Sequence, residues 1–281
     1  MRRDWGGRGR ALAGVAVMTV ALGACNLIQP LDPTLKAGFL TTDRNDDYGI
    51  TVVNGDAVSS APTTNEGGNT RIAFWPAGEA QTLDQQSCMS WVEGDHVSQQ
   101  GLTLRARSVN GRTSAITVTK NIWYHGYWVY NVHVMDSGNT QQPFIQIASF
   151  DLSGAVIRNG QQAPGPWRLC ARVVGDAVSV KVWAADEAEP AWMDGVHGGG
   201  VMLPAGWDTI GAPGWYVGHL LPGVSTTYTA REVVHLDTPE ALGADAPAPS
   251  SRQAPPADVT DGSAPPTTVP YREPTDIPVA P

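Results

Sequence analysis

Apolar and polar residues alternate through the middle of this chain with a period of two. In the segment 114–124, Ile116, Val118 and Ile122 alternate with polar residues such as Thr117 and Thr119. Successive side chains of a β-strand point to opposite faces of its sheet. The pattern therefore predicts a strand that turns one face to a core and keeps the other face polar.

The segment 127–135 alternates in the same way and predicts the neighbouring strand. Its polar face carries Tyr127, Asn131 and His133, and its apolar face carries Trp128, Tyr130, Val132 and Val134. His125 and Gly126 lie between the two segments, which indicates an antiparallel hairpin.

Further strand-like patterns cover most of the central chain. They occupy 71–75, 89–92, 102–108, 144–150, 168–173, 178–183, 215–220 and 226–234. In 102–108 the pattern places Leu102, Leu104 and Ala106 on the core side, opposite Thr103, Arg105 and Arg107. No long window has apolar residues at helical spacing. About ten strands separated by turns predict an all-β sandwich or barrel.

The two ends of the chain differ from this central region. Residues 1–24 contain four arginines, an apolar run over 11–22 and small residues before Cys25. This order is typical of a secretory signal, and the run is shorter than the roughly 20 residues of a membrane span. Residues 237–281 are rich in Pro, Ala and Asp without apolar periodicity, so they predict a disordered tail.

The tetrapeptide Leu22-Gly23-Ala24-Cys25 ends the signal and resembles the cleavage motif of bacterial lipoproteins. The resemblance implies that Cys25 receives a diacylglyceryl group and that residues 1–24 are removed; cleavage without lipid attachment is the alternative. We therefore expect a protein anchored to the cell membrane through Cys25 and facing the extracytoplasmic side. Residues 25–36 would be a spacer and 37–236 the folded domain.

Removal of the signal would leave an acidic chain. The full sequence has 18 Lys+Arg and 27 Asp+Glu, of which residues 1–24 hold four Arg and one Asp, so 14 basic and 26 acidic residues remain. A formal charge of −12 follows. This charge argues against nucleic acid or an anionic lipid surface as a partner.

The two remaining cysteines are Cys88 and Cys170. In an exported chain such a pair predicts one disulfide bond. A redox or metal pair is the alternative, but the chain has neither a Cys-x-x-Cys motif nor clustered histidines.

A longer resemblance covers residues 166–218. Residues 166–183 read PWRLCARVVGDAVSVKVW, followed by Glu-Pro-Ala-Trp at 189–192 and Gly-Trp-Tyr-Val-Gly at 214–218. This resembles the concanavalin A-like lectin/glucanase family, including its laminin-G-like modules. The resemblance implies a jelly roll of two packed antiparallel sheets, one of them concave. Family members bind glycans or hydrolyse glycosidic bonds, so the resemblance leaves both functions open.

The residues give little sign of catalysis. The chain lacks the Glu-x-Asp-x-x-Glu run of the family's glucanases, a Gly-x-Ser-x-Gly motif and the histidine spacing of zinc sites. We expect no enzyme, although a carboxylate pair assembled by folding stays open.

Calcium is the one cofactor that the sequence suggests. Asp43, Asn45 and Asp47 place oxygen ligands at the first, third and fifth positions of a calcium-type loop. Tyr48 stands where such loops have glycine, and Asn54 stands where they end in glutamate. An acidic turn without a metal is the alternative.

Aromatic and polar residues on the predicted polar faces suggest a binding surface for sugars. These residues are Trp123, Tyr127, Asn131, His133, Lys181 and Trp183. Sugar rings stack on flat aromatic side chains while their hydroxyls form hydrogen bonds, but aromatic residues also fill cores. We expect a non-catalytic carbohydrate-binding lipoprotein; the alternatives are a lipoprotein that holds a protein partner and a glycoside hydrolase.

Overall fold

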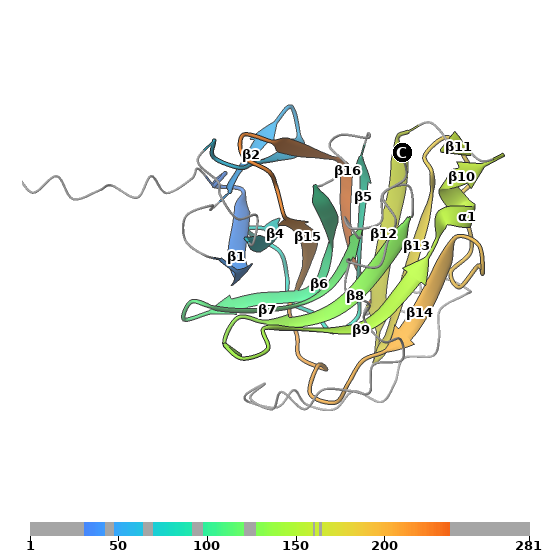
Figure 1. The fold of residues 1–281 in the computed structure, drawn as a ribbon. Helices are drawn as coiled ribbons and strands as arrows, with labels where there is room; N and C mark the ends of the chain where they lie inside the picture. The colour runs from blue at the N-terminus through green and yellow to red at the C-terminus, as the bar shows by residue number, and fades with distance from the viewer. Residues whose placement is uncertain are drawn as a thin grey trace, which may run out of the picture.

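The structure is a computed structural model that describes residues 31–42, 48–63, 70–91, 98–120, 128–159, 161–162 and 165–236. Most of these residues form two antiparallel sheets of seven strands that pack face to face (Figure 1). The fold is the antiparallel two-sheet sandwich that the sequence predicts.

The first sheet, here the front sheet, has the strand order β1-β4-β15-β6-β7-β8-β9. Its strands are β1 (Leu35–Thr41), β4 (Arg71–Pro76), β15 (Ala212–Gly218), β6 (Gln99–Val109), β7 (Arg112–Lys120), β8 (Val129–Asp136) and β9 (Phe144–Asp151).

The second sheet, here the back sheet, has the order β14-β13-β12-β5-β16-β3-β2. Its strands are β14 (Gly198–Met202), β13 (Ala177–Ala184), β12 (Trp167–Val174), β5 (Gln85–Trp91), β16 (Ser225–His235), β3 (Asp56–Ser60) and β2 (Gly49–Val53). A short helix, α1 (Ser153–Val156), and the strand pair β10 (Ile157–Arg158) and β11 (Gln161–Gln162) follow β9.

All ten predicted segments overlap strands of this sandwich. The sequence patterns did not predict β1, β2, β3 or β14; of these, β2, β3 and β14 have only five residues each. The predicted turn at His125 and Gly126 lies outside the described residues, while the strands on either side of it pair antiparallel.

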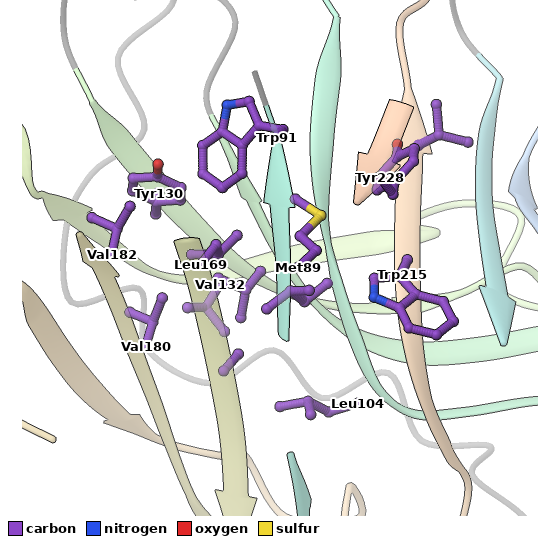
Figure 2. Close-up of a cluster of buried hydrophobic side chains, with 14 of the residues drawn as sticks. Met89, Trp91, Leu104, Tyr130, Val132, Leu169, Val180, Val182, Trp215 and Tyr228 are labelled. Carbon is purple, nitrogen blue, oxygen red and sulfur yellow. The ribbon is translucent and has the colours of Figure 1, made fainter. Parts of the chain in front are cut away.

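The main core lies between the two sheets. Figure 2 shows side chains of the back sheet, such as Met89 and Leu169, meeting side chains of the front sheet, such as Leu104 and Val132. Trp128, predicted for this core, is 2% exposed. Burial of such large apolar surfaces from both sheets is the main force that holds the two layers together.

A β-bulge in β6 changes the predicted pattern. Arg105 has φ of 50°, and its side chain donates hydrogen bonds to the carbonyls of Leu83, Trp207 and Gly175 at 2.9, 2.7 and 2.6 Å. Burial lowers the pKa of its guanidinium to about 10, although nearby carboxylates oppose this shift. Ala106, expected in the main core, instead packs on the other face of the front sheet. The extra residue of a bulge shifts the alternation of side chains by one position.

The front sheet is strongly rolled. Arg71 of β4 and Phe144 of β9 belong to strands separated by five strand spacings, or about 24 Å in a flat sheet. Yet the guanidinium carbon of Arg71 is 5.1 Å from the centre of the Phe144 ring. A Cβ atom on Gly38 of β1 would likewise overlap Thr113 of β7. The curvature is visible in β7, β8 and β9 (Figure 1).

The inside of this roll is the face turned away from the main core, here the concave face. A second apolar cluster packs there with residues from β1, β4, β6, β7, β8 and β15. Its members are Leu40, Ala73, Trp75, Ala106, Ala115, Met135, Ala212 and Tyr216. The roll therefore has an interior of its own, part apolar and part polar.

Candidate ligand-binding site

Three polar side chains form a row across the concave face, here the polar row. Thr103 of β6 lies opposite Thr117 of β7, which lies opposite His133 of β8. Their exposed fractions are 0%, 0% and 9%. The alternation of these strands puts them on the concave face, because Leu102, Ile116 and Val132 point to the main core.

The polar row has unused hydrogen-bonding capacity. Neither the hydroxyls of Thr103 and Thr117 nor Nδ1 of His133 has a hydrogen-bond partner within the described chain. The large majority of buried side-chain polar atoms have such a partner, and each exception requires an explanation. Three adjacent exceptions on one face form a buried polar patch whose hydrogen-bonding capacity the described part of the chain leaves unused.

The residues beside the polar row, in contrast, hold one another in place. The Tyr216 hydroxyl donates to Oε1 of Gln99 at 2.7 Å, and Nε2 of Gln99 lies 3.5 Å from the hydroxyl of Thr119. The Ser149 hydroxyl donates to Oδ1 of Asn131 at 2.9 Å. These bonds fix a frame of amide and hydroxyl groups next to the polar row.

The side chains of the polar row are uncharged near neutral pH. Burial lowers the pKa of His133 to about 3, with a further contribution from the nearby Arg71 guanidinium. Burial raises the pKa of the Tyr216 phenol to about 12, against the opposing effect of Arg71. A ligand in the row would therefore meet neutral donors and acceptors, with the positively charged Arg71 guanidinium close by.

An exposed aromatic ring lies next to the row. Phe144 is 41% exposed, and its ring centre is 6.0 Å from that of His133 in an edge-to-face arrangement. Arg71 packs against the same ring and donates a hydrogen bond to the Thr41 hydroxyl at 2.9 Å. Phe144 thus offers an apolar surface beside buried polar groups.

The structure brings together only part of the predicted ligand set. Asn131 and His133 lie on the concave face, as the alternation of β8 indicates. Trp123 and Tyr127 lie outside the described residues.

Lys181 and Trp183 belong to β13 of the back sheet and face away from its core. They are therefore separated from Asn131 and His133 by the whole thickness of the sandwich. The alternation of apolar and polar residues predicts which side chains share one face of a strand. It does not predict which faces of different strands come together in the fold.

The surface around Lys181 is covered by the chain itself. Its ammonium forms an ion pair with Glu189 at 2.7 Å, donates to the carbonyl of Pro190 at 2.8 Å and lies 4.3 Å from the ring centre of Trp192. Arg172 approaches the Trp192 ring at 4.3 Å as well. The segment 189–192 thus uses the polar groups that were predicted to bind a ligand here.

The disulfide prediction is confirmed. Cys88 of β5 and Cys170 of β12 are direct neighbours across the back sheet, and their sulfur atoms are bonded at 2.04 Å. Both residues are buried beside Trp183. The bond ties together two central strands that lie 82 residues apart in the sequence.

The calcium prediction concerns Asp43, Asn45 and Asp47, which lie outside the described residues. Across the ranges that the structure describes, no group of three or more His, Cys, Asp or Glu residues is placed to hold a metal ion. In the same ranges, no helix combines the length and apolar character that a bilayer span requires.

Sequence reasoning missed most of the polar row. The alternation does place Thr103 and Thr117 on a polar face, which suggests contact with solvent. Only the rolling of the sheet buries their hydroxyls. Arg71 and Phe144, at strand ends far apart in the sequence, carry no signal that they meet.

Comparisons with known proteins give only distant likenesses. No protein-family model matches the sequence, and no curated protein matches it. Among solved structures, the carbohydrate-binding module CBM66 from Bacillus subtilis is 9% identical with a TM-score of 0.38, over 73% of this chain and 98% of that chain.

Two further solved structures have similar scores. The exoplasmic/lumenal domain of VIP36 in its Ca²⁺-bound form is 9% identical with a TM-score of 0.44, over 73% of this chain and 85% of that chain. A Bacillus subtilis protein of unknown function with a galectin-like fold is 10% identical with a TM-score of 0.43, over 72% and 89%. Identities and TM-scores this low do not bear on the site.

Proposed function

We propose that this domain is a non-catalytic module that binds carbohydrate on the concave face of the front sheet. The observation that carries the proposal is the polar row of Thr103, Thr117 and His133. Their buried polar atoms lie on adjacent strands and have no hydrogen-bond partner in the described part of the chain. A buried polar atom without a partner costs about 1–3 kcal/mol. A ligand that supplies the missing hydrogen bonds would recover this free energy on binding.

The chemistry of the row favours a polyhydroxylated, neutral ligand. Threonine hydroxyls both donate and accept hydrogen bonds, and a neutral imidazole has one donor and one acceptor nitrogen. Sugar hydroxyls have the same dual character. The exposed Phe144 ring beside His133 offers the apolar surface on which the C–H groups of a sugar ring would stack.

The experiment is a glycan-array screen of the chain without residues 1–25, followed by titration calorimetry on the glycans that bind. Thr117→Val, which removes one hydroxyl and keeps the shape, should weaken binding about tenfold. Thr113→Val is the matched control in the same strand, because the Thr113 hydroxyl already donates to Ser108 at 3.2 Å. Equal affinity of the wild type and Thr117→Val would exclude the polar row as the site.

Trp123 and Tyr127 remain predicted contributors to glycan binding. If they belong to the site, Trp123→Ala should weaken glycan binding and leave the melting temperature nearly unchanged. Trp128→Ala is the matched comparison, because Trp128 is buried in the main core and its truncation should cost about 3–5 kcal/mol. Similar losses of stability in both variants would assign Trp123 to the core.

We further propose that the domain is tethered to the outer side of a cell membrane through a lipid on Cys25. The support is the basic, apolar and small-residue order of residues 1–24 before this cysteine. Two acyl chains on one residue give durable anchoring where a single chain binds reversibly. Cys25→Ser should move the protein from the detergent phase to the aqueous phase or leave the signal uncleaved, and a processed but membrane-bound variant would contradict lipidation.

A further inference from the structure

The Cys88–Cys170 bond lies on the outer face of the back sheet, which is turned away from the main core. The neighbours of Cys170 along β12, Leu169 and Ala171, both belong to the main core, so the alternation of the strand points Cys170 outward. Residues on the outer face of a sandwich ordinarily meet solvent. Cys88 and Cys170 are nevertheless only 2% and 1% exposed, so other parts of the chain cover the bond.

The connection from β13 to β14, residues 185–197, supplies part of this cover. Two antiparallel neighbours can be joined by about two to five residues, so this connection is longer than the pairing of the strands requires. Its Trp192 packs against the buried cluster of Cys88, Cys170 and Trp183. Residues 189–192, here the lid, thus lie over the outer face beside the disulfide.

Two buried cations hold the lid. The guanidinium carbon of Arg172 and the ammonium nitrogen of Lys181 each lie 4.3 Å from the centre of the Trp192 ring, and both residues are 2% exposed. Cation–π contacts are stronger when the cation is shielded from water. Lys181 also binds the Glu189 carboxylate and the carbonyl of Pro190. The lid is therefore fastened by side chains that rise from the strands beneath it.

The contacts of the lid are separate from the strand pairing. Residues 185–197 lie between strands, and the Glu189 side chain is 59% exposed. Met193, directly after the lid, has φ of 64°, a conformation that is uncommon for residues other than glycine. Beyond it, the Asp194 carboxylate accepts hydrogen bonds from two following backbone N–H groups at 2.9 and 3.0 Å. Local opening of such a segment, anchored at one end, needs less free energy than unfolding of the sheet.

From this arrangement we infer that the lid controls the access of external thiols to the Cys88–Cys170 bond. In the closed state, Trp192 helps to cover the two sulfur atoms, and a reducing thiolate cannot reach them. When the lid opens, the bond becomes reducible while both sheets stay folded. The lid is thus a redox gate on the tie between β5 and β12, and this inference does not depend on carbohydrate binding.

The reaction that the lid would gate is thiol–disulfide exchange. A thiolate of the reductant attacks one sulfur atom, the S–S bond breaks, a mixed disulfide forms and the other cysteine leaves as a thiolate. A second thiol of the reductant then displaces the cysteine that is still bound. Both cysteines end as thiols, and the reductant is oxidised to a disulfide. Each attack needs a direct approach to a sulfur atom, which is why a cover over the bond slows the reaction.

The test is the rate at which dithiothreitol reduces the native chain without residues 1–25. Samples are alkylated at intervals, and their free thiols are counted by mass spectrometry. Trp192→Ala removes both cation–π contacts of the lid, so its open population and its rate of reduction should rise about tenfold. Trp207→Ala is the matched control, because Trp207 is likewise half-buried but packs against the main core; its rate should stay close to that of the wild type.

A second variant keeps the test independent of the loss of the indole. Glu189→Gln preserves the shape of the lid but removes its ion pair with Lys181, and it should speed reduction by about twofold to fivefold. Global unfolding is measured in urea for every variant. The lid is supported if reduction of Trp192→Ala accelerates by more than its change in global unfolding accounts for. No acceleration, or one that follows global unfolding as in Trp207→Ala, would overturn the gate; if Trp192→Ala does not fold, the same criterion applies to Glu189→Gln.

Discussion

Replacement of Thr117 by valine should make the free protein more stable and its ligand complex weaker. Valine has nearly the shape of threonine, so the change removes the hydroxyl and leaves the packing in place. Thr117 is fully buried and its hydroxyl has no partner within the described chain. An unsatisfied buried hydroxyl costs about 1–3 kcal/mol, and its loss should return a large part of this free energy.

The size of the effect is measurable. For a domain of this length, each kcal/mol shifts the melting temperature by roughly 2–4 °C. We expect Thr117→Val to raise the melting temperature by roughly 2–8 °C in differential scanning calorimetry without a ligand. Thr113→Val, which breaks a hydrogen bond to Ser108, should instead lower stability by about 1 kcal/mol.

The opposite signs make the reasoning refutable. A structural hydroxyl would stabilise the fold, and its removal would lower the melting temperature in both variants alike. If Thr117→Val destabilises the protein as much as Thr113→Val, the Thr117 hydroxyl already has a partner, for example a buried water. The polar row would then not be a site that awaits a ligand.

Three further predictions follow from the same structure. Loss of the Cys88–Cys170 bond in the Cys88→Ser variant should cost about 2–5 kcal/mol in chemical denaturation; two reactive thiols in the oxidised, denatured wild type would contradict the bond. The pKa of His133 is lowered to about 3 in the folded protein, so between pH 6.5 and 3 the unfolded chain binds a proton that the folded protein does not. Stability should therefore fall as the pH falls through this window, by up to about 1.4 kcal/mol per pH unit, and the same slope in His133→Gln would show that His133 is not responsible. Tyr130→Phe should raise the unfolding free energy by about 1 kcal/mol, because the buried Tyr130 hydroxyl has no partner within the described chain, whereas Tyr216→Phe loses the bond to Gln99 and should lower it; a loss in both variants would reveal a partner for Tyr130.

The sequence by itself determined the fold class and much of the core. Alternation in the segments 114–124 and 127–135 assigned Ile116, Val118, Trp128 and Tyr130 to the buried side, and all four lie in the main core. This works because the period of a strand is set by local backbone geometry, which leaves each face a fixed set of residues. The disulfide was predictable because the sequence pattern predicts export and assigns Cys25 to a lipid, which leaves a single possible cysteine pair.

Only the tertiary structure decided which faces meet and how deeply they are buried. Lys181 and His133 both occupy polar faces in the sequence, yet they lie on opposite sides of the sandwich because their strands belong to different sheets. The bulge at Arg105 moved Ala106 from the main core to the concave face. The local sequence pattern does not reveal such a shift. An extra residue in a strand changes which residues of the neighbouring strand it pairs with, but it leaves the types of residue in the strand as they were.

The candidate site depends on the same long-range geometry. Thr103 and Thr117 read as members of a solvated strand face, and the rolling of the front sheet turned that face into an interior. The roll results from packing among β1, β4, β7 and β9, whose residues lie far apart in the chain. The sequence therefore placed Thr103, Thr117 and His133 on the polar faces of their strands. The tertiary structure decided that these three would be buried without hydrogen-bond partners in the described chain, because the curvature of a sheet is set by contacts between distant strands.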